Sequence, residues 1–155
     1  MRQRVGFIGL GDMGKPMARR VLGAGYQVTS SARRRRDAID ALKSFGLIEV
    51  ESPFVVAKQS DVVITMVVDE AQSDVVLRGA GGALAGLAAG SVLVIMSTLS
   101  PEYCQSLAAE AADARVAVLD CPVAGGRPRA EQGNLSLICG GPAEIIEKCR
   151  PILEA

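Results

Sequence analysis

The chain has 155 residues, of which 49% are apolar and 22% charged, and its 17 basic and 17 acidic side chains balance. Length and composition of this kind indicate one globular domain, and they give no electrostatic reason to expect a nucleic-acid or membrane partner. The sequence contains no histidine, which excludes Ser-His-Asp and Cys-His catalysis, imidazole zinc sites and histidine acid–base chemistry within this chain. We expect no metal site.

The four cysteines, Cys104, Cys121, Cys139 and Cys149, form no CxxC pair. Scattered thiols in a chain of this size are typical of reduced, buried cysteines, and a disulfide or a metal site is the alternative interpretation. We therefore expect an intracellular, cytoplasmic protein, although a mitochondrial location is also compatible. The longest apolar runs are strand-sized, so no transmembrane segment is predicted, and the apolar run near the N-terminus breaks too early for a signal peptide.

Short apolar strands alternate with amphipathic helices along the whole chain. Strands are predicted at 5–9, 26–31, 47–50, 61–68, 91–96, 116–119 and 134–139. Helices are predicted from Met13 to Gly23, at 37–45, 53–59, 69–77 and 101–114, within 79–90, and from Pro142 onward, whereas 125–133 is expected to be a polar loop. This alternation predicts an α/β fold with a Rossmann-type, doubly wound, mostly parallel sheet in three α/β/α layers, as one domain over residues 1–155.

A glycine-rich segment directly follows the first predicted strand and opens the first predicted helix. Its residues, Gly9, Leu10, Gly11, Asp12, Met13 and Gly14, form the pattern G-x-G-x-x-G. In this context the first glycine allows a tight turn, the second lets a pyrophosphate approach the backbone, and the third lets the helix pack near the strand. The helix N-terminus then offers free N–H groups to the phosphates. We predict a dinucleotide site; the alternative is a glycine-rich turn without a ligand.

The end of the second predicted strand favours NADP over NAD as the dinucleotide. A fold that prefers NAD places an acidic residue there for the ribose 2′-hydroxyl. This strand ends instead at Ser31, and four arginines follow at 33–36. A guanidinium can bind a 2′-phosphate in a bidentate manner, so we predict Arg33 as the main contact, assisted by Ser31 or Arg34. The alternative is a solvated basic turn or a nuclear-localisation-like patch.

Five segments of the chain stand out in order. They are VGFIGLGDMGKPMA at 5–18, Ala32-Arg33, the strand ending Met66-Val67-Val68, the stretch MSTLSP at 96–101, and DCPVAGG at 120–126. In this order they resemble the N-terminal half of the β-hydroxyacid dehydrogenases, a family that includes 3-hydroxyisobutyrate dehydrogenase and tartronate semialdehyde reductase, and the related NADP-binding domain of 6-phosphogluconate dehydrogenase. The last of the five segments is similar to the family's substrate-binding turn D-A-P-V-S-G-G.

The resemblance implies roles for particular residues. Met66, Val67 and Val68 would run beside the adenosine and ribose of the cofactor, and Thr98 would border the nicotinamide. Ser100 is expected to cap the helix that follows. Ala124, Gly125 and Gly126 would bind the substrate, with the two glycines offering backbone N–H groups to a carboxylate; without the family, this pair is merely a flexible loop.

The sequence departs from the family pattern in ways that weaken the substrate assignment. Ala124 replaces the family serine, and Arg20 replaces an asparagine of the first helix. Met66-Val67-Val68 stands where the family has Met-Leu-Pro, so the proline is absent. The family's catalytic lysine matches none of Lys15, Lys43, Lys58 and Lys148. We expect it beyond Ala155, so we predict no catalytic residue in this chain.

The resemblance implies an NADP(H)-binding domain of an oxidoreductase that transfers hydride to or from a small 3-hydroxy acid or its semialdehyde. By itself this fragment is expected to be inactive, and a homodimer is possible. One alternative is a non-catalytic NADP-binding module of a fusion protein. Another is a related reductase, such as an imine reductase or a 6-phosphogluconate dehydrogenase relative.

Overall fold

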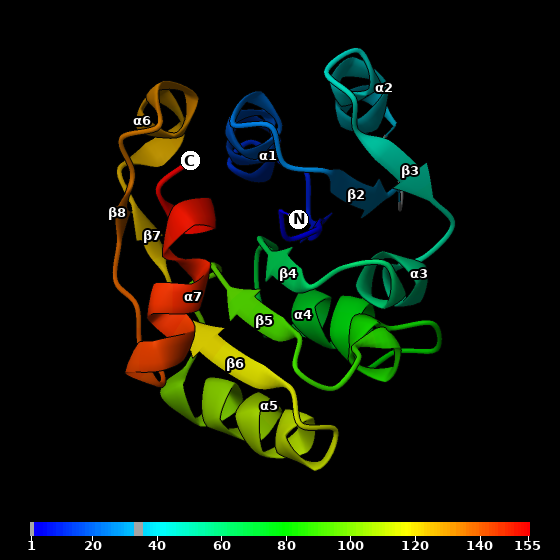
Figure 1. Ribbon diagram of the computed structural model, residues 1–155, viewed down its shortest axis with the longest axis vertical. Coiled ribbons are helices and arrows are strands. Elements are labelled where there is room, and N and C mark those ends of the chain that lie inside the picture. Colours follow the sequence, from blue (N-terminus) through cyan, green and yellow to red (C-terminus); the bar gives the residue numbers. More distant parts are fainter. Residues whose placement is uncertain (1, 33–35) are drawn as a thin grey trace.

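The computed structural model describes residues 2–32 and 36–155. A six-stranded parallel sheet with the order β3-β2-β1-β4-β5-β6 forms its centre (Figure 1). The strands are β1 (Val5–Ile8), β2 (Val28–Ser31), β3 (Ile48–Val50), β4 (Val62–Thr65), β5 (Val92–Ile95) and β6 (Ala117–Asp120). The chain builds outward from β1 on one side and then returns to β4 on the other. The carboxyl ends of β1 and β4 therefore flank the switch point at which open α/β sheets bind ligands.

Helices cover both faces of the sheet, and this confirms the predicted three-layer α/β/α architecture (Figure 1). One face carries α1 (Gly14–Gly23), α2 (Asp37–Lys43), α6 (Gly126–Gln132) and α7 (Ala143–Leu153). The other face carries α3 (Pro53–Lys58), α4 (Glu70–Leu77), α5 (Pro101–Asp113) and the short 3₁₀ helix η1 (Ala83–Gly86). Among the described helices, none is long and apolar enough to cross a bilayer.

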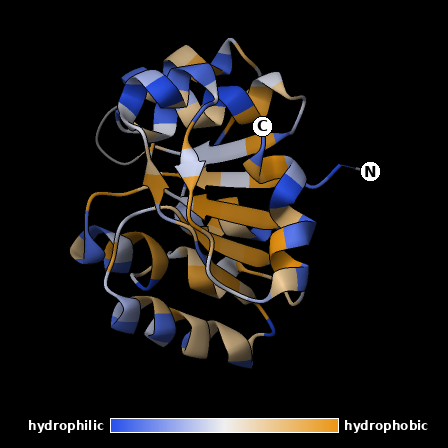
Figure 2. Cartoon of the chain, turned by 90° about the vertical axis from the view of Figure 1, so that its left-hand side faces the viewer, coloured by the Kyte–Doolittle hydropathy of each residue, from blue (hydrophilic) through white to orange (hydrophobic). Residues whose placement is uncertain are grey.

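Alternate residues of the buried strands supply two separate apolar cores. In β4, Val62 and Ile64 face the layer of α1, whereas Val63 faces the layer of α3. All four residues in each of β1, β4 and β5 are buried, as expected for parallel strands covered on both faces. Figure 2 shows hydrophobic strands at the centre of the fold, between helices that carry both hydrophilic and hydrophobic residues.

The prediction of a loop at 125–133 is wrong, because most of this segment forms helix α6. Three features favour the helix despite the glycine, arginine and proline content of the segment. Ala130 is buried in the core beside α1, Arg127 forms an i,i+4 ion pair with Glu131, and Gly133 ends the helix in the left-handed conformation at φ 72°, which glycine adopts at no steric cost.

The predicted strand at 134–139 is also shorter than expected and lies outside the main sheet. Only β8 (Ser136–Leu137) forms, and it pairs antiparallel with β7 (Val123–Ala124). A single antiparallel bridge between Asp120 and Gly140 joins this pair to the end of β6. Helix α6 therefore sits in an excursion that leaves β6 and returns beside it (Figure 1).

Candidate functional site: the carboxyl edge of the sheet

The glycine-rich segment makes a tight turn between β1 and α1. Gly9 has φ of +98°, and a β-carbon on it would overlap the carbonyl oxygen of Met66. A β-carbon on Gly14 would overlap the carbonyl oxygen of Gly9 and approach the Phe7 ring to 3.2 Å. Both positions therefore exclude larger side chains, because the atoms in the way are backbone.

Gly11 differs from Gly9 and Gly14, because a β-carbon on Gly11 would meet nothing within 4 Å. The open space lies at the start of α1, whose N-cap residue, Met13, makes no capping hydrogen bond with its side chain. Within the described residues, the backbone N–H groups of Gly11, Asp12 and Met13 donate no hydrogen bond to backbone. The turn thus presents unused donors at the positive end of a helix, beside room for a ligand, and this arrangement fits a pyrophosphate.

The end of β4 lies against this turn. Met66 donates its N–H to the carbonyl of Ile8 at 2.8 Å, and Val67 donates its N–H to the Ser97 hydroxyl at 2.9 Å. Ser97 is 1% exposed, so one buried hydroxyl joins the ends of β4 and β5. No role was predicted for Ser97 from the sequence, although it stands in the stretch MSTLSP at 96–101 that resembles the family.

Thr98 and Ser100 differ in their surroundings, and the structure bears on the predicted role of Ser100 alone. Thr98 is exposed beyond the end of β5. The Ser100 hydroxyl accepts a hydrogen bond from Tyr103 N–H at 3.3 Å and caps α5, as predicted. The same hydroxyl donates to the Glu70 carboxylate at 2.6 Å, and this bond is the main reason that the pKa of Glu70 is lowered. The contact between Glu70 and Ser100 was not predicted from the sequence.

The end of β2 offers no carboxylate to a ribose. Ser31 is its last residue and is partly buried opposite Val50 of β3. The predicted contacts Arg33 and Arg34 lie outside the described residues. Arg36 is described and forms an ion pair with Glu49 at 2.9 Å. Glu49 also forms an ion pair with Lys43 at 2.6 Å. One arginine of the run is therefore already held by the protein.

The predicted substrate turn closes the same edge of the sheet. Ala124, Gly125 and Gly126 are exposed and lead from β7 into α6. Gly125 has φ of +135° and Gly126 has φ of +72°, both in the region that favours glycine. The side chain of Arg129 lies over Gly125, where its Cδ would stand 2.7 Å from a β-carbon.

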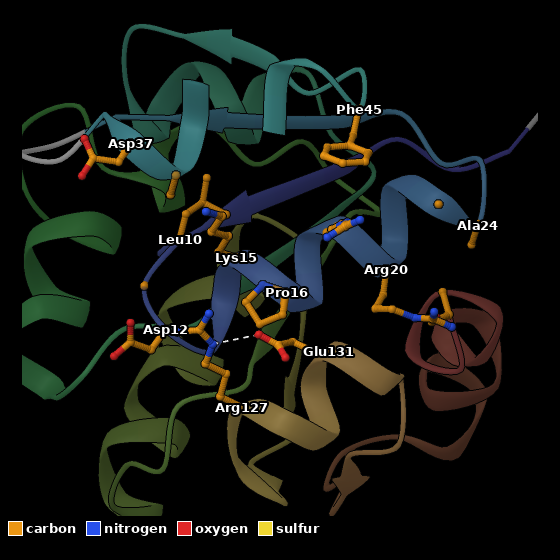
Figure 3. Close-up of a pocket in the computed structure, with 15 residues that line it drawn as sticks. Leu10, Asp12, Lys15, Pro16, Arg20, Ala24, Asp37, Phe45, Arg127 and Glu131 are labelled. Carbon is orange, nitrogen blue, oxygen red and sulfur yellow. Dashed lines mark hydrogen bonds and ion pairs between the residues drawn. The ribbon is translucent and has the colours of Figure 1, made fainter. Parts of the chain in front are cut away.

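A cavity of about 990 Å³ reaches the glycine turn but extends away from the carboxyl edge, over the outer side of α1. Its walls include Asp12 and Arg127, which approach from facing elements (Figure 3). The pKa of Arg127 is raised mainly by Glu131, with a smaller contribution from Asp12. At its far end, Arg19 lies over the Phe45 ring, 4.5 Å from the centroid. This cavity does not include Val67, Thr98 or the substrate turn, so cavity size alone does not locate the predicted site.

The structure thus places each described residue of the predicted site at the carboxyl end of a strand or in the segment that follows one. The glycine turn follows β1, Ser31 ends β2, Met66–Val68 follow β4, and Thr98 follows β5. Ala124 ends the short strand β7, which comes after β6, and Gly125 and Gly126 follow it. No group of three or more potential metal ligands gathers within the described residues. A Rossmann sheet with a G-x-G-x-x-G turn at its switch point defines a dinucleotide-binding class of domain.

Comparison with known proteins identifies the family within this class. Residues 4–155 match the NAD binding domain of 6-phosphogluconate dehydrogenase. An uncharacterized oxidoreductase, YfjR, of Bacillus subtilis is 38% identical over 98% of this chain and 53% of its own length. The L-threonate dehydrogenase of Cupriavidus necator is 33% identical over the whole chain and 52% of its own length.

A solved structure agrees with the sequence matches. The 3-hydroxyisobutyrate dehydrogenase of Salmonella typhimurium superposes with a TM-score of 0.91 at 30% identity, over 99% of this chain and 53% of that one. The chain therefore belongs to the β-hydroxyacid dehydrogenase family, in the part that corresponds to the NAD-binding domain. It spans about half the length of the curated relatives that it matches.

Proposed function

We propose that this chain is the NADP(H)-binding domain of an oxidoreductase that transfers hydride between the nicotinamide and a small 3-hydroxy acid or its semialdehyde. The observation that carries the proposal is the glycine turn. Gly9 and Gly14 are packed against backbone, whereas Gly11 faces open space beside unused N–H donors. If the turn served only to connect β1 to α1 tightly, it would need neither the open space at Gly11 nor the unpaired N–H donors at the start of α1.

The preference for NADP(H) rests on charge at the end of β2. A carboxylate there would repel a 2′-phosphate, and β2 ends in Ser31. Four arginines follow it in the sequence, and Arg36 is engaged by Glu49 and Asp40. We propose Arg33 as the main partner of the 2′-phosphate, with Ser31 or Arg34 assisting, because a charge-assisted guanidinium contact matches phosphate geometry.

The remaining residues of the carboxyl edge would position the reactants. Thr98 offers an exposed hydroxyl to the carboxamide or the ribose, and Gly125 and Gly126 would offer backbone N–H groups to a substrate carboxylate. The nicotinamide supplies hydride chemistry when it is bound, and the protein contributes orientation and charge. Ala124 lacks the hydroxyl that the family serine would add.

A proton must also move when an alcohol is oxidised, and the lysines described here are poorly placed for it. Lys43 is paired with Glu49 at 2.6 Å. Lys148 donates to the Gly90 carbonyl at 3.0 Å, near the amino end of β5. Lys58 ends α3 before β4 begins, and Lys15 lines the cavity over α1. We therefore propose that this chain binds NADP(H) without turning over 3-hydroxyisobutyrate, glycerate or threonate.

The test is a fluorescence titration of the chain with NADPH and with NADH. We expect tighter binding of NADPH, and Arg33→Ala should weaken NADPH binding about 10- to 100-fold, the equivalent of one charge-assisted contact. Arg36→Ala is the matched control: it removes the same charge from an arginine held by Glu49, and NADPH affinity should change less than about threefold.

Equal affinity for the two dinucleotides, unchanged by Arg33→Ala, would contradict the NADP preference. Tighter binding of NADH would reverse it. Turnover of any of the three hydroxy acids by this chain would contradict the proposed division between cofactor binding and proton transfer.

A further inference from the structure

Two cysteines face each other where the chain leaves β6 and later returns. Asp120 and Gly140 exchange both backbone hydrogen bonds, at 3.0 and 2.6 Å. The same antiparallel register continues to Val123 opposite Leu137. Cys121 and Cys139, each one position from the Asp120–Gly140 bridge, are therefore directly opposite.

The place of this pair in the hydrogen-bonding pattern brings the side chains close. Antiparallel pairs alternate between hydrogen-bonded and non-hydrogen-bonded, and Cα atoms in the second kind are only about 4.5 Å apart. The 120–140 pair is hydrogen-bonded, so the 121–139 pair is of the second kind. That separation lies within the Cα range of about 4.4–6.8 Å that a disulfide spans. The two Sγ atoms lie 2.7 Å apart as free thiols.

The two thiols differ in access to solvent. Cys121 is 0% exposed, whereas Cys139 is partly exposed. Burial, followed by the contact with Cys139, raises the pKa of Cys121. Cys149 is buried in the same apolar core, and Cys104 lies in the core on the other face of the sheet. An external reagent therefore reaches the Cys139 sulfur first. Cys121 is then placed to react with the modified Cys139 sulfur.

We propose that Cys121 and Cys139 are a redox modification site that reacts with a low-molecular-weight disulfide and becomes an intramolecular disulfide. The Cys139 thiolate attacks one sulfur of the reagent RSSR, the S–S bond breaks, and one thiolate RS⁻ leaves. Cys121 then loses its proton and attacks the Cys139 sulfur of the mixed disulfide, and the second RS⁻ leaves. The two protons released by the cysteines match the two RS⁻ groups, giving two RSH. Two protein thiols are oxidised and one RSSR is reduced.

The new bond would close the base of the excursion that carries α6. The backbone is already fixed there by the Asp120–Gly140 bridge, so the sulfurs need to approach by only about 0.7 Å to reach the disulfide length of about 2.05 Å. The substrate turn begins three residues after Cys121, which places this modification beside the proposed substrate-binding residues. The proposal does not depend on which cofactor or substrate the domain binds.

Oxidised glutathione is the probe, followed by alkylation, trypsin digestion and mass spectrometry. The four cysteines fall in separate tryptic peptides, because Arg115, Arg129 and Lys148 lie between them. We expect the peptide containing Cys121 to be linked to the one containing Cys139, with a mass lower by two hydrogens. Cys104 and Cys149 should stay alkylated, and dithiothreitol should reverse the link.

Variants distinguish the order of the two steps. In Cys121→Ala, glutathione should accumulate as a mixed disulfide on Cys139, because the second thiol is missing. In Cys139→Ser, which changes a partly exposed side chain, Cys121 should stay unmodified. Cys104→Ala is the control and should give the wild-type link. The proposal is overturned if all four thiols survive in the wild type, if glutathione stays on Cys139 there, or if Cys139 links to Cys149.

Discussion

The carbonyl oxygen of Gly9 occupies the place where a β-carbon on Gly14 would stand. The first and third glycines of the turn therefore hold α1 against the end of β1, and the second glycine is left open. This division gives a sharp test, because the glycines differ in what an added methyl group would meet.

Gly14→Ala should destabilise the fold, whereas Gly11→Ala should leave it nearly intact. The methyl at position 14 would collide with backbone, and overpacking of this kind costs about 1–3 kcal/mol. The methyl at position 11 would enter open space, so the free energy of unfolding should change by less than about 0.5 kcal/mol. Urea unfolding measures both values. Gly11→Ala should still weaken NADPH binding about tenfold or more by keeping the pyrophosphate from the backbone; unchanged affinity would remove the turn from the site.

Ser100→Ala should lower stability by about 1 kcal/mol, the usual contribution of an N-cap side chain. The substitution removes both the cap on α5 and the hydrogen bond to Glu70. Thr98→Ala is the matched control, because Thr98 is exposed and makes no side-chain hydrogen bond among the described residues. Thermal unfolding should separate the two variants, and an equal loss in both would contradict the assignment of the cap to Ser100.

Asp61→Asn should lower the melting temperature at neutral pH but not in strong acid. Arg4 donates to the Asp61 carboxylate from its backbone N–H at 2.8 Å and from its guanidinium at 2.8 and 3.2 Å. The side-chain hydrogen bond from Arg4 is the main cause of the lowered pKa of Asp61. A carboxyl group with a lowered folded-state pKa stabilises the fold above its unfolded pKa of about 3.9, and this contribution is lost as pH falls through the folded value.

The expected size of this effect is small, about 1 kcal/mol or less, because the side chains of Arg4 and Asp61 are 49% and 42% exposed and water screens the pair. The melting temperatures of wild type and variant should begin to converge below about pH 4 and should coincide only once the pH falls below the lowered pKa of Asp61. Glu51→Gln, at an exposed acid without an ion pair among the described residues, serves as the control. A difference between wild type and Asp61→Asn that persists at low pH would show a cause other than charge.

Alanine substitutions at two other glycines should have opposite signs. Gly133 ends α6 at φ 72°, and a β-carbon there would also touch the Arg20 guanidinium, so Gly133→Ala should cost about 1 kcal/mol. Gly23 ends α1 without a positive φ, and a β-carbon there would meet nothing within 4 Å. Gly23→Ala should therefore stabilise by about 0.4–1 kcal/mol. Denaturant midpoints measure both, and equal signs would contradict the described end of α6.

Sequence predicted the main sheet and the glycine turn because their signals are local. Buried parallel strands such as Val62–Thr65 are continuously apolar, and the turn glycines stand directly between a strand and a helix. Helix α6 escaped prediction because its stability depends on burying Ala130 against distant α1. The composition of residues 125–133 is typical of a loop, and no local sequence pattern indicates that Ala130 is buried.

The pairing of Cys121 with Cys139 was equally beyond sequence. Their spacing fits no thiol motif, and only the antiparallel register set by the Asp120–Gly140 bridge brings them together. Ser97 and Glu70 were missed for the same reason, since each acts on a residue 30 positions away, Val67 and Ser100 respectively. Candidate site residues could be placed by strand ends, but the contacts that hold those ends together depend on tertiary structure.

The most direct test of the central claim is a titration of the ¹⁵N-labelled chain with NADP⁺, followed through backbone amide resonances. The account predicts saturable shifts that are largest at Gly11, Asp12 and Met13, with further shifts at Val67 and Thr98 along the carboxyl edge. Shifts confined to Arg19 and Phe45, in the cavity over α1, or no shifts at all, would contradict a dinucleotide site at the switch point of the sheet.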